Sequence, residues 1–269
     1  MPEALASLRK YWWVGYTAAR SNLAYLTEVA TRTLFLVLIL FIFLQLWRVT
    51  YQAEGSERLA GLTLTEMLWY LAVTEAITIS TVNVGAEVDS DVRTGALAVQ
   101  LIRPLSYPLY RLCLMLGERF VRFAINISVA LLIALLLAGG ITLSPSGVLM
   151  CIVVLPLAFT LDFFGEFVIG LLAFWLEDTS GLRLIYRRLT MILGGMLFPL
   201  PLFPDWAQPI LNALPFASVV YAPARLLIRP DAQFFVETLA KQFTFVVLYA
   251  AITFLLFRVA VRKVNNNGG

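Results

Sequence analysis

The sequence has no histidine and only two cysteines among its 269 residues. Without histidine, neither a Ser/His/Asp nor a Cys/His catalytic set can form, and the commonest nitrogen ligand for a metal is missing. Cys113 and Cys151 lie in separate apolar runs with no metal-ligand or redox spacing, so we interpret them as packing residues. The composition therefore argues against hydrolytic and metal chemistry.

A phosphate-binding loop is absent as well, because no Gly-x-x-x-x-Gly-Lys-Ser/Thr sequence occurs. Such a loop cradles nucleotide phosphates with its backbone N–H groups. We therefore expect no cofactor in this chain and no enzymatic activity of its own. If ATP drives its work, ATP and Mg²⁺ must be bound by a partner protein.

Apolar residues are abundant: 60% of the chain is hydrophobic and only 14% is charged, whereas roughly 25% is charged in a typical soluble domain. Since a helical bilayer crossing takes about 20 residues, the sequence predicts a single all-α polytopic membrane domain over 1–269 with six transmembrane helices. These spans are expected at about 31–51, 64–85, 112–137, 147–175, from 189 to a break at Pro199, Pro201 and Pro204, and 243–261.

Prolines also punctuate the apolar segment 204–227 before the last span. Short helices that dip into the bilayer suit such a segment better than a full crossing, which predicts an extracytoplasmic re-entrant region. Three aromatic residues in or beside it, Phe203, Trp206 and Phe216, are open to two interpretations. They anchor the segment at the headgroup level, or they form an extracytoplasmic gate on the exit path of a substrate.

The first thirty residues combine aromatic and basic side chains in a segment less apolar than a span. They include Trp12, Trp13 and Tyr16 among Arg9, Lys10 and Arg20. This predicts an amphipathic helix in the inner interface, either a plain anchor or a helix that moves with a cytoplasmic partner. The first ten residues lack the pattern of a signal peptide, so we expect the N-terminus to be retained.

Basic residues set the orientation. With the N-terminus inside, fifteen of the 20 lysines and arginines fall on the cytoplasmic side, as the positive-inside rule requires. We therefore expect a multi-pass protein of the cell (inner) membrane with both termini in the cytoplasm. The net charge of +3 is then a topology signal, and no nucleic acid partner is expected.

A charged loop at 86–110 separates the second and third predicted spans. Acidic residues lead into Arg93-Thr94-Gly95, a short apolar run follows, and Arg103-Pro104 ends it. Acidic residues before a helix and a basic residue after it complement the helix dipole. The loop is therefore predicted to hold a short, capped, semi-exposed helix that acts as a rigid cytoplasmic lever.

This loop, together with other short segments in the same order, resembles permeases of the ABC transporter type-2 family, in a poorly characterised branch. Those segments are Trp175-Leu-Glu177-Asp178-Thr-Ser-Gly181, Gly194-Gly195, Pro199-Leu-Pro201, Pro215-Phe216 and Tyr221-Ala-Pro223. The resemblance implies a dimer of permeases with two ATPase (nucleotide-binding) subunits, and the branch implies that the second permease is a different chain rather than a copy.

The resemblance also implies site residues. The loop would be the coupling helix that docks on the ATPase, with a second, weaker cytoplasmic contact after the fourth span. The coupling residues would be Arg93, Thr94, Gly95, Leu97, Leu101, Arg103 and Pro104, and the second contact would use Glu177, Asp178 and Arg183.

Charges within the spans are the remaining candidates for function, because they are costly in a bilayer. Arg119 and Arg122 begin the third span, and Asp162 and Glu166 share one face of the fourth. Arg119 and Glu166 lie at similar depths, so we predict that they pair. The pair is either a structural salt bridge or a gate at the inner mouth; alternatively, both arginines snorkel to the interface.

These observations favour a permease subunit of an ATP-driven exporter, surrounded by membrane lipids, that moves an amphiphilic or hydrophobic substrate by alternating access. The alternative is a proton- or ion-coupled secondary carrier with Asp162 and Glu166 as coupling carboxylates. A non-transporting scaffold has no specific feature in its favour.

Overall fold

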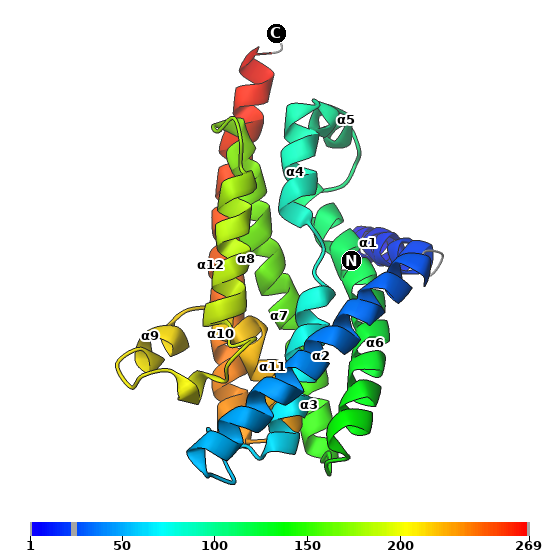
Figure 1. Ribbon diagram of the computed structural model, residues 1–269. Helices are drawn as coiled ribbons and strands as arrows, with labels where there is room; N and C mark the ends of the chain where they lie inside the picture. Colours follow the sequence, from blue (N-terminus) through cyan, green and yellow to red (C-terminus); the bar gives the residue numbers. More distant parts are fainter. Residues whose placement is uncertain (1, 23–25, 268–269) are drawn as a thin grey trace.

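The computed structural model describes residues 2–22 and 26–267, and its regular elements there are helices. Five segments are long and apolar enough to cross a membrane, one of them formed by two helices in succession. They are α2 (Leu26–Glu54), α3 (Leu64–Ile79) with α4 (Val84–Arg93), α6 (Tyr107–Ala138), α7 (Pro145–Leu171) and α12 (Ala232–Asn267). The segments form an elongated bundle (Figure 1), which confirms the all-α polytopic fold.

The bundle has two distinct ends (Figure 1). At the elbow end lie α4, the short helix α5 (Ala96–Leu101) and the last part of α12. At the far end, the loops before α3, α7 and α12 come together. There Trp69 Nε1 donates to the carbonyl of Gly139 at 2.9 Å, and Arg229 Nη2 lies 3.1 Å from Glu66 Oε2.

Helix α1 (Pro2–Asn22) crosses α6 instead of running along the bundle (Figure 1). The two backbones touch, since a Cβ at Gly117 would lie 2.1 Å from the carbonyl oxygen of Gly15. The indoles of Trp12 and Trp13 stay exposed. A crosswise helix with exposed indoles has the geometry that an interfacial helix requires. Residues 23–25 of the predicted interfacial segment lie outside the described part.

The fifth predicted span differs most from expectation. Helix α8 (Ser180–Leu193) follows a 3-10 turn, η1 (Leu172–Phe174), and starts nine residues before the predicted 189. Its 14 residues cover about 21 Å, less than the roughly 30 Å of a hydrocarbon core. The chain then reaches the far end through short helices (Figure 1): η2 (Leu200–Leu202), α9 (Gln208–Ala213), α10 (Phe216–Val219) and α11 (Tyr221–Ile228).

The predicted start was wrong because three arginines in α8 lower the hydropathy of its first two turns. The break also comes at Gly194, ahead of the prolines at which we expected it. Within the predicted re-entrant segment 204–227, only α9 projects from the side of the bundle (Figure 1). Helices α10 and α11 are buried instead, with Ala224 and Leu226 fully inaccessible.

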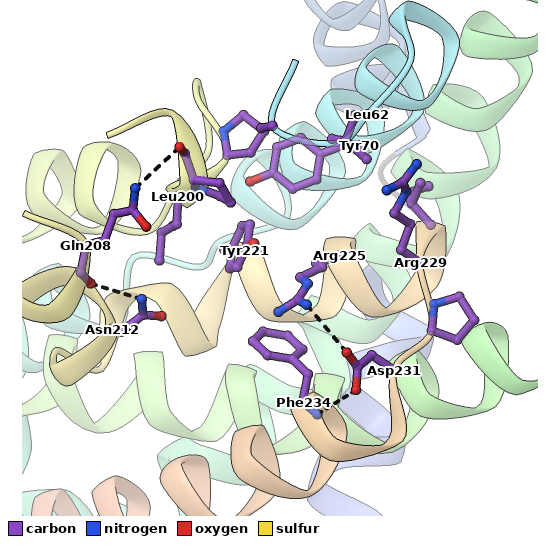
Figure 2. Close-up of a pocket in the computed structure, with 15 residues that line it drawn as sticks. Leu62, Tyr70, Leu200, Gln208, Asn212, Tyr221, Arg225, Arg229, Asp231 and Phe234 are labelled. Carbon is purple, nitrogen blue, oxygen red and sulfur yellow. Dashed lines mark hydrogen bonds and ion pairs between the residues drawn. The ribbon is translucent and has the colours of Figure 1, made fainter. Parts of the chain in front are cut away.

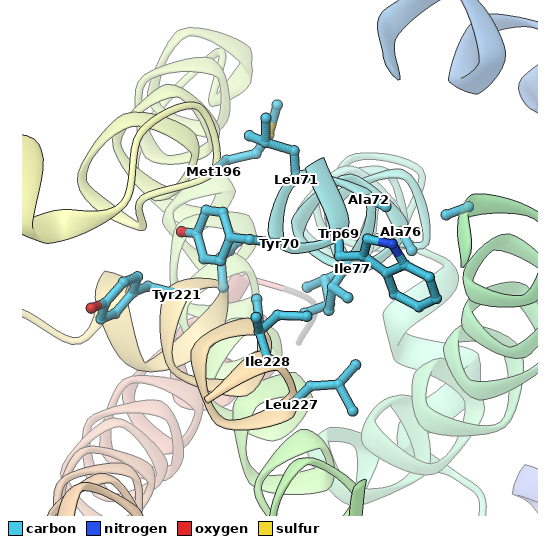
Figure 3. Packing of buried hydrophobic residues seen from close by; sticks show 14 of the residues in the cluster. Trp69, Tyr70, Leu71, Ala72, Ala76, Ile77, Met196, Tyr221, Leu227 and Ile228 are labelled. Atoms are coloured by element: carbon cyan, nitrogen blue, oxygen red, sulfur yellow. The ribbon is translucent and has the colours of Figure 1, made fainter. Parts of the chain in front are cut away.

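The core is centred on α3, against which the broken segment packs (Figure 3). Leu71 and Tyr70 of α3 face Met196 and Tyr221, and Ile77 lies toward Ile228. Hydrogen bonds fix this contact, because the Tyr70 hydroxyl donates to the carbonyl of Gly195 and Thr74 Oγ1 donates to that of Met196 at 3.1 Å. The chain can turn there because Gly195 adopts a positive φ of 75°. The interruption in the fifth crossing is thus a packed, hydrogen-bonded structure.

Candidate functional site

The predicted lever is a two-helix elbow at the elbow end. Helix α4 ends at Thr94, whose hydroxyl donates to the carbonyl of Ser90 at 2.7 Å. Gly95 then takes a φ of 73°, a left-handed conformation that favours glycine, and α5 begins. Figure 1 shows the two helices projecting beyond the level at which α1 crosses α6. The sequence thus gives the elbow its shape through one glycine between two short helices.

The predicted coupling residues do not all face outward. Leu97 is buried at 2% exposure and packs in a cluster with Val88 and Phe167, so it holds α5 to the bundle. The apolar side chains that α5 and its cap expose are Val99 at 62% and Ile102 at 83%. Sequence reasoning missed these two, although each lies next to or near a residue that it did select.

The charged residues of the elbow are held by partners. Arg93 Nε bonds Asp89 Oδ2 at 2.9 Å, and the Arg103 guanidinium lies 5.9 Å from the ring centroid of Tyr110. The other five predicted coupling residues, Thr94, Gly95, Leu97, Leu101 and Pro104, fall within or directly after the same two helices. The structure therefore gathers all seven at one end of the molecule.

The predicted second contact lies beside the elbow. Thr179 Oγ1 donates to Asp89 Oδ1 at 2.7 Å, and Arg183 lies 3.6 Å from the same carboxylate oxygen. The hydroxyl and backbone N–H of Ser180 both donate to Asp178, which lowers the pKa of that carboxyl. Glu177 is exposed. Asp89 and the buried Thr179, which sequence reasoning did not select, therefore join α4 to the start of α8.

A second group of charges joins the elbow to α6. Arg111 bonds Glu87 at 2.6 Å and also bonds Asp91, while the Tyr107 hydroxyl donates to Asp91 at 2.6 Å. Sequence reasoning treated Arg111 only as a charge that sets topology. A push on α4 would therefore reach both α6 and α8 through side-chain contacts.

Three of the four predicted gate charges lie in two ion pairs, and neither is the pair that we predicted. Arg119 Nη1 bonds Asp162 Oδ2 at 2.6 Å, while Glu166 Oε1 accepts from Arg187 Nε at 2.8 Å. The predicted pairing of Arg119 with Glu166 is therefore wrong. The two carboxylates are one helical turn apart, about 6 Å in depth, and α8 supplies a second arginine that depth counting did not include.

Arg122 lies apart from these pairs. It pairs with Glu118 one turn earlier on α6, and its Nε donates to Asn22 of α1 at 3.3 Å. Of the four charges predicted to form a gate, the structure therefore brings three together: Arg119, Asp162 and Glu166.

Helix α4 touches this charge cluster directly. The backbone N–H of Gly85, in the first turn of α4, donates to Glu166 Oε2 at 3.2 Å. The approach is close on both sides, because a Cβ at Gly85 would lie 2.8 Å from that oxygen and a Cβ at Gly170 would lie 2.8 Å from the Gly85 carbonyl oxygen. The elbow and the charge cluster are thus parts of one connected structure.

Two of the cavities that the described residues border are of similar size and are lined by charged side chains. The inner cavity, of about 440 Å³, is bordered by the charge cluster and by α8. The far-end cavity, of about 450 Å³, has Arg225 at its centre, 3.7 Å from Asp231 and 3.7 Å from the ring centroid of Phe234 (Figure 2). Both volumes fall in the range of ligand pockets.

The three predicted gate aromatics do not come together. Trp206 is exposed at 75%, and Phe203 is half-buried against the core. Phe216 instead lies in the bundle, with its ring centroid 5.9 Å from that of Tyr186 on α8. None of the three is among the residues that border the far-end cavity. The structure therefore does not bring the three aromatic residues together at one site, as a shared extracytoplasmic gate would require.

Metal ligands do not cluster in the described residues, where no group of three or more Cys, Asp and Glu side chains could hold an ion. The comparison with protein families gives a match that extends over most of the chain. A family model described as ABC-2 family transporter protein matches residues 35–268, which include the elbow, the charge cluster and both cavities. The chain matches no curated protein.

Proposed function

This chain belongs to the ABC-2 transporter family, and from that premise we propose that it is the membrane-spanning subunit of an ATP-driven exporter of amphiphilic or hydrophobic substrates. A multi-pass membrane permease of an ABC transporter works with an ATPase subunit. In the proposal, that partner binds ATP and Mg²⁺, docks on the elbow, and drives alternating access. The complex would sit in the cell (inner) membrane with both chain termini in the cytoplasm.

The observation that carries the proposal is the connection between the elbow and the charge cluster. A docked ATPase would contact the exposed side chains of Val99 and Ile102 and push α5 and α4. Motion of α4 would act on Glu166 through Gly85 and on α8 through Asp89. The elbow would then change the inner cavity without any contact between the ATPase and the substrate.

The arrangement of carboxylates favours this mechanism over a proton- or ion-coupled carrier. Asp162 and Glu166, which such a carrier would use as coupling groups, are each held by an arginine. Asp162 is paired with the buried Arg119 and would give up that partner before it takes a proton, which is costly. Glu166 is itself buried, and its partner Arg187 is 39% exposed. The second permease is proposed to be a different chain, as in the branch that the sequence resembles.

Purification tests the proposal. The tagged protein would be isolated from its native membranes in mild detergent, its stoichiometric companions identified, and vanadate-sensitive ATP hydrolysis measured. We expect a companion with a phosphate-binding loop, and we expect Ile102→Glu and Arg103→Ala to reduce its binding or its hydrolysis. Arg58→Ala, at the exposed far end, is the matched control and should change neither. A chain that purifies with no ATPase would refute the proposal and favour the carrier.

A further inference from the structure

The inner cavity holds an unusual set of charges for its depth. Three arginines, Arg119, Arg187 and Arg188, border it with two carboxylates, Asp162 and Glu166. The formal charges leave an excess of one positive charge. Four of the five charges form the pairs Arg119–Asp162 and Arg187–Glu166, so the excess belongs to Arg188, which is exposed. A group with one negative charge would balance it through a contact that water screens.

Donor groups at the cavity point to the same conclusion. Arg119 is 2% exposed, yet its Nε–H has no hydrogen-bond partner within the described part of the chain, and the same holds for the buried Nη2 of Arg187. Unpaired buried donors are rare and costly. Guanidinium groups match the oxygens of a phosphate or a carboxylate especially well. These donors therefore suit an oxyanion that enters from the cavity.

The cavity lies at the level of a membrane surface. Arg119 follows Gly117 by two residues, and Gly117 is the point at which α1 crosses α6. If α1 lies in the inner interface, as its sequence predicts, the charge cluster is at the headgroup level of the inner leaflet. A headgroup could then enter the cavity while its chain stays in the hydrocarbon region.

The remaining lining of the cavity is mixed: Thr78, Thr81, Asn83 and Thr190 are polar, and five residues are apolar, namely Ile77, Leu184, Met191, Val219 and Val220. Ile77, Val219 and Val220 are buried on the side toward the middle of the bundle, and Leu184 of α8 is 56% exposed at the rim. Further along the same helix, Ile185 and Ile192 are also exposed. An alkyl chain attached to a headgroup in the cavity thus has apolar surface to follow.

We propose that the inner cavity binds the anionic headgroup of a single- or double-chain amphiphile, with Arg119 and Arg187 as its donors. The inference rests on the proposed function and narrows it: the exported substrate is an amphiphile with a phosphate, sulfate or carboxylate head. The far-end cavity differs in its donors. Arg225 pairs with Asp231 (Figure 2) and Arg229 pairs with Glu66, the two arginine side chains are 34% and 39% exposed, and neither has a buried nitrogen without a partner in the described residues.

Photolabelling of the full chain in phosphatidylcholine nanodiscs tests this. The probe is a 12-carbon alkyl phosphate with a diazirine at the end of its chain. We expect saturable labelling that dodecyl phosphate competes and dodecylphosphocholine does not, mapping to α8 and α10. Labelling that never saturates, that both compounds compete equally, or that maps only to α1 or α12 would overturn the inference.

Variants locate the headgroup. Changing Glu166→Gln and Arg187→Gln together removes a donor without leaving a buried charge alone, and should raise the midpoint of saturation at least about tenfold, the value of one charge-assisted hydrogen bond. The matched control, Arg225→Gln with Asp231→Asn, removes a pair from the far-end cavity and should leave the midpoint unchanged. The opposite pattern, or equal shifts in both, would contradict the assignment.

A further variant covers the case in which the paired change prevents folding. Arg188 is exposed, and its partner among the described residues is Met191 Sδ, at 3.8 Å. Arg188→Gln therefore leaves no buried carboxylate alone and should raise the midpoint by a smaller factor. An unchanged midpoint would count against the site. A chain that couples to its ATPase but shows no headgroup preference refutes this inference alone, whereas labelling without any ATPase partner refutes the proposed function.

Discussion

The inner and far-end cavities are alike in volume and each is bordered by arginine–carboxylate pairs, but the pairs differ in exposure. The side chains of Arg119 and Asp162 are 2% and 6% exposed, whereas those of Arg225 and Asp231 are 34% and 47% exposed. Exposed pairs are weak because water screens them, and buried pairs are costly to separate because it does not. Two cavities lined by similar arginine–carboxylate pairs can therefore differ greatly in the free energy that is lost when one partner is removed.

The two ends also differ in which elements their polar contacts connect. At the far end, Arg229 and Arg58 both contact Glu66, which caps the start of α3. These contacts fasten neighbouring loops. Toward the elbow end, Asp89 and Glu166 link α4 to α7 and α8, three helices that the proposed mechanism moves together. In the proposed mechanism the elbow end transmits motion, whereas the contacts at the far end hold its loops together.

The largest effect is expected from Arg119→Gln. The change leaves the Asp162 carboxylate in a buried site without its partner, so the free energy of unfolding should fall by about 3–5 kcal/mol. Unfolding in mixed micelles, followed by tryptophan fluorescence, measures it. Adding Asp162→Asn should recover much of the loss, because no charge is then left alone. If the single and double variants are equally stable, the pair is not buried as described.

Gly85→Ala should have the next largest effect. Its Cβ would lie 2.8 Å from Glu166 Oε2 and 2.9 Å from the Glu166 carbonyl oxygen, so α4 must move away from α7 at a cost of about 1–3 kcal/mol. Gly181→Ala is the matched control, since its Cβ meets nothing within 4 Å. The same unfolding measurement checks both. Equal stability of the two variants would mean that α4 is not tightly held, and that the elbow end is no stiffer than the far end.

Local composition explains which parts of the fold could be predicted. The span predicted at 147–175 matches α7 with η1 closely, because long apolar runs need no knowledge of neighbours. The span predicted at 64–85 starts with α3 but ends eight residues before α4 does, since the charged residues of α4 were assigned to the loop. The elbow was likewise predicted from local sequence, since Gly95 and the flanking charges act within a few residues. The contacts that these elements make could not be predicted in the same way, because their partners lie far away in the sequence.

Long-range packing explains the rest. Helix α8 is too polar for a span on its own, and its position is set by Asp89 and Thr179 at one end and by Tyr70 beneath Gly195 at the other. Without that position, Arg187 could not be recognised as the partner of Glu166. One misplaced helix therefore led to the wrong pairing of two charges.

A moderate effect is expected from Thr63→Ala at the far end. The Thr63 hydroxyl accepts from the backbone N–H of Glu66, and the Glu66 side chain accepts in return from the backbone N–H of Thr63 at 2.8 Å. Loss of such a cap costs about 1 kcal/mol. Thr50→Ala, which removes an exposed hydroxyl bonded only within its own helix, should change the stability by less than about 0.5 kcal/mol. A reversed order would show that the cap does not hold α3.

The smallest effect is expected from Arg229→Gln. Its side chain is 39% exposed, and Arg58 remains 3.8 Å from the same carboxylate oxygen of Glu66, so the loss should be at most about 1 kcal/mol. Unfolding at low and high salt would test this, because screening by salt should reduce even that loss. The comparison with Arg119 depends on the result. Suppose that Arg229→Gln lowered the stability as much as Arg119→Gln, and equally so at high salt. The difference between the two ends could then not be explained by the exposure of their ion pairs, and the charges of the inner cavity would not be electrostatically distinct from those of the far end.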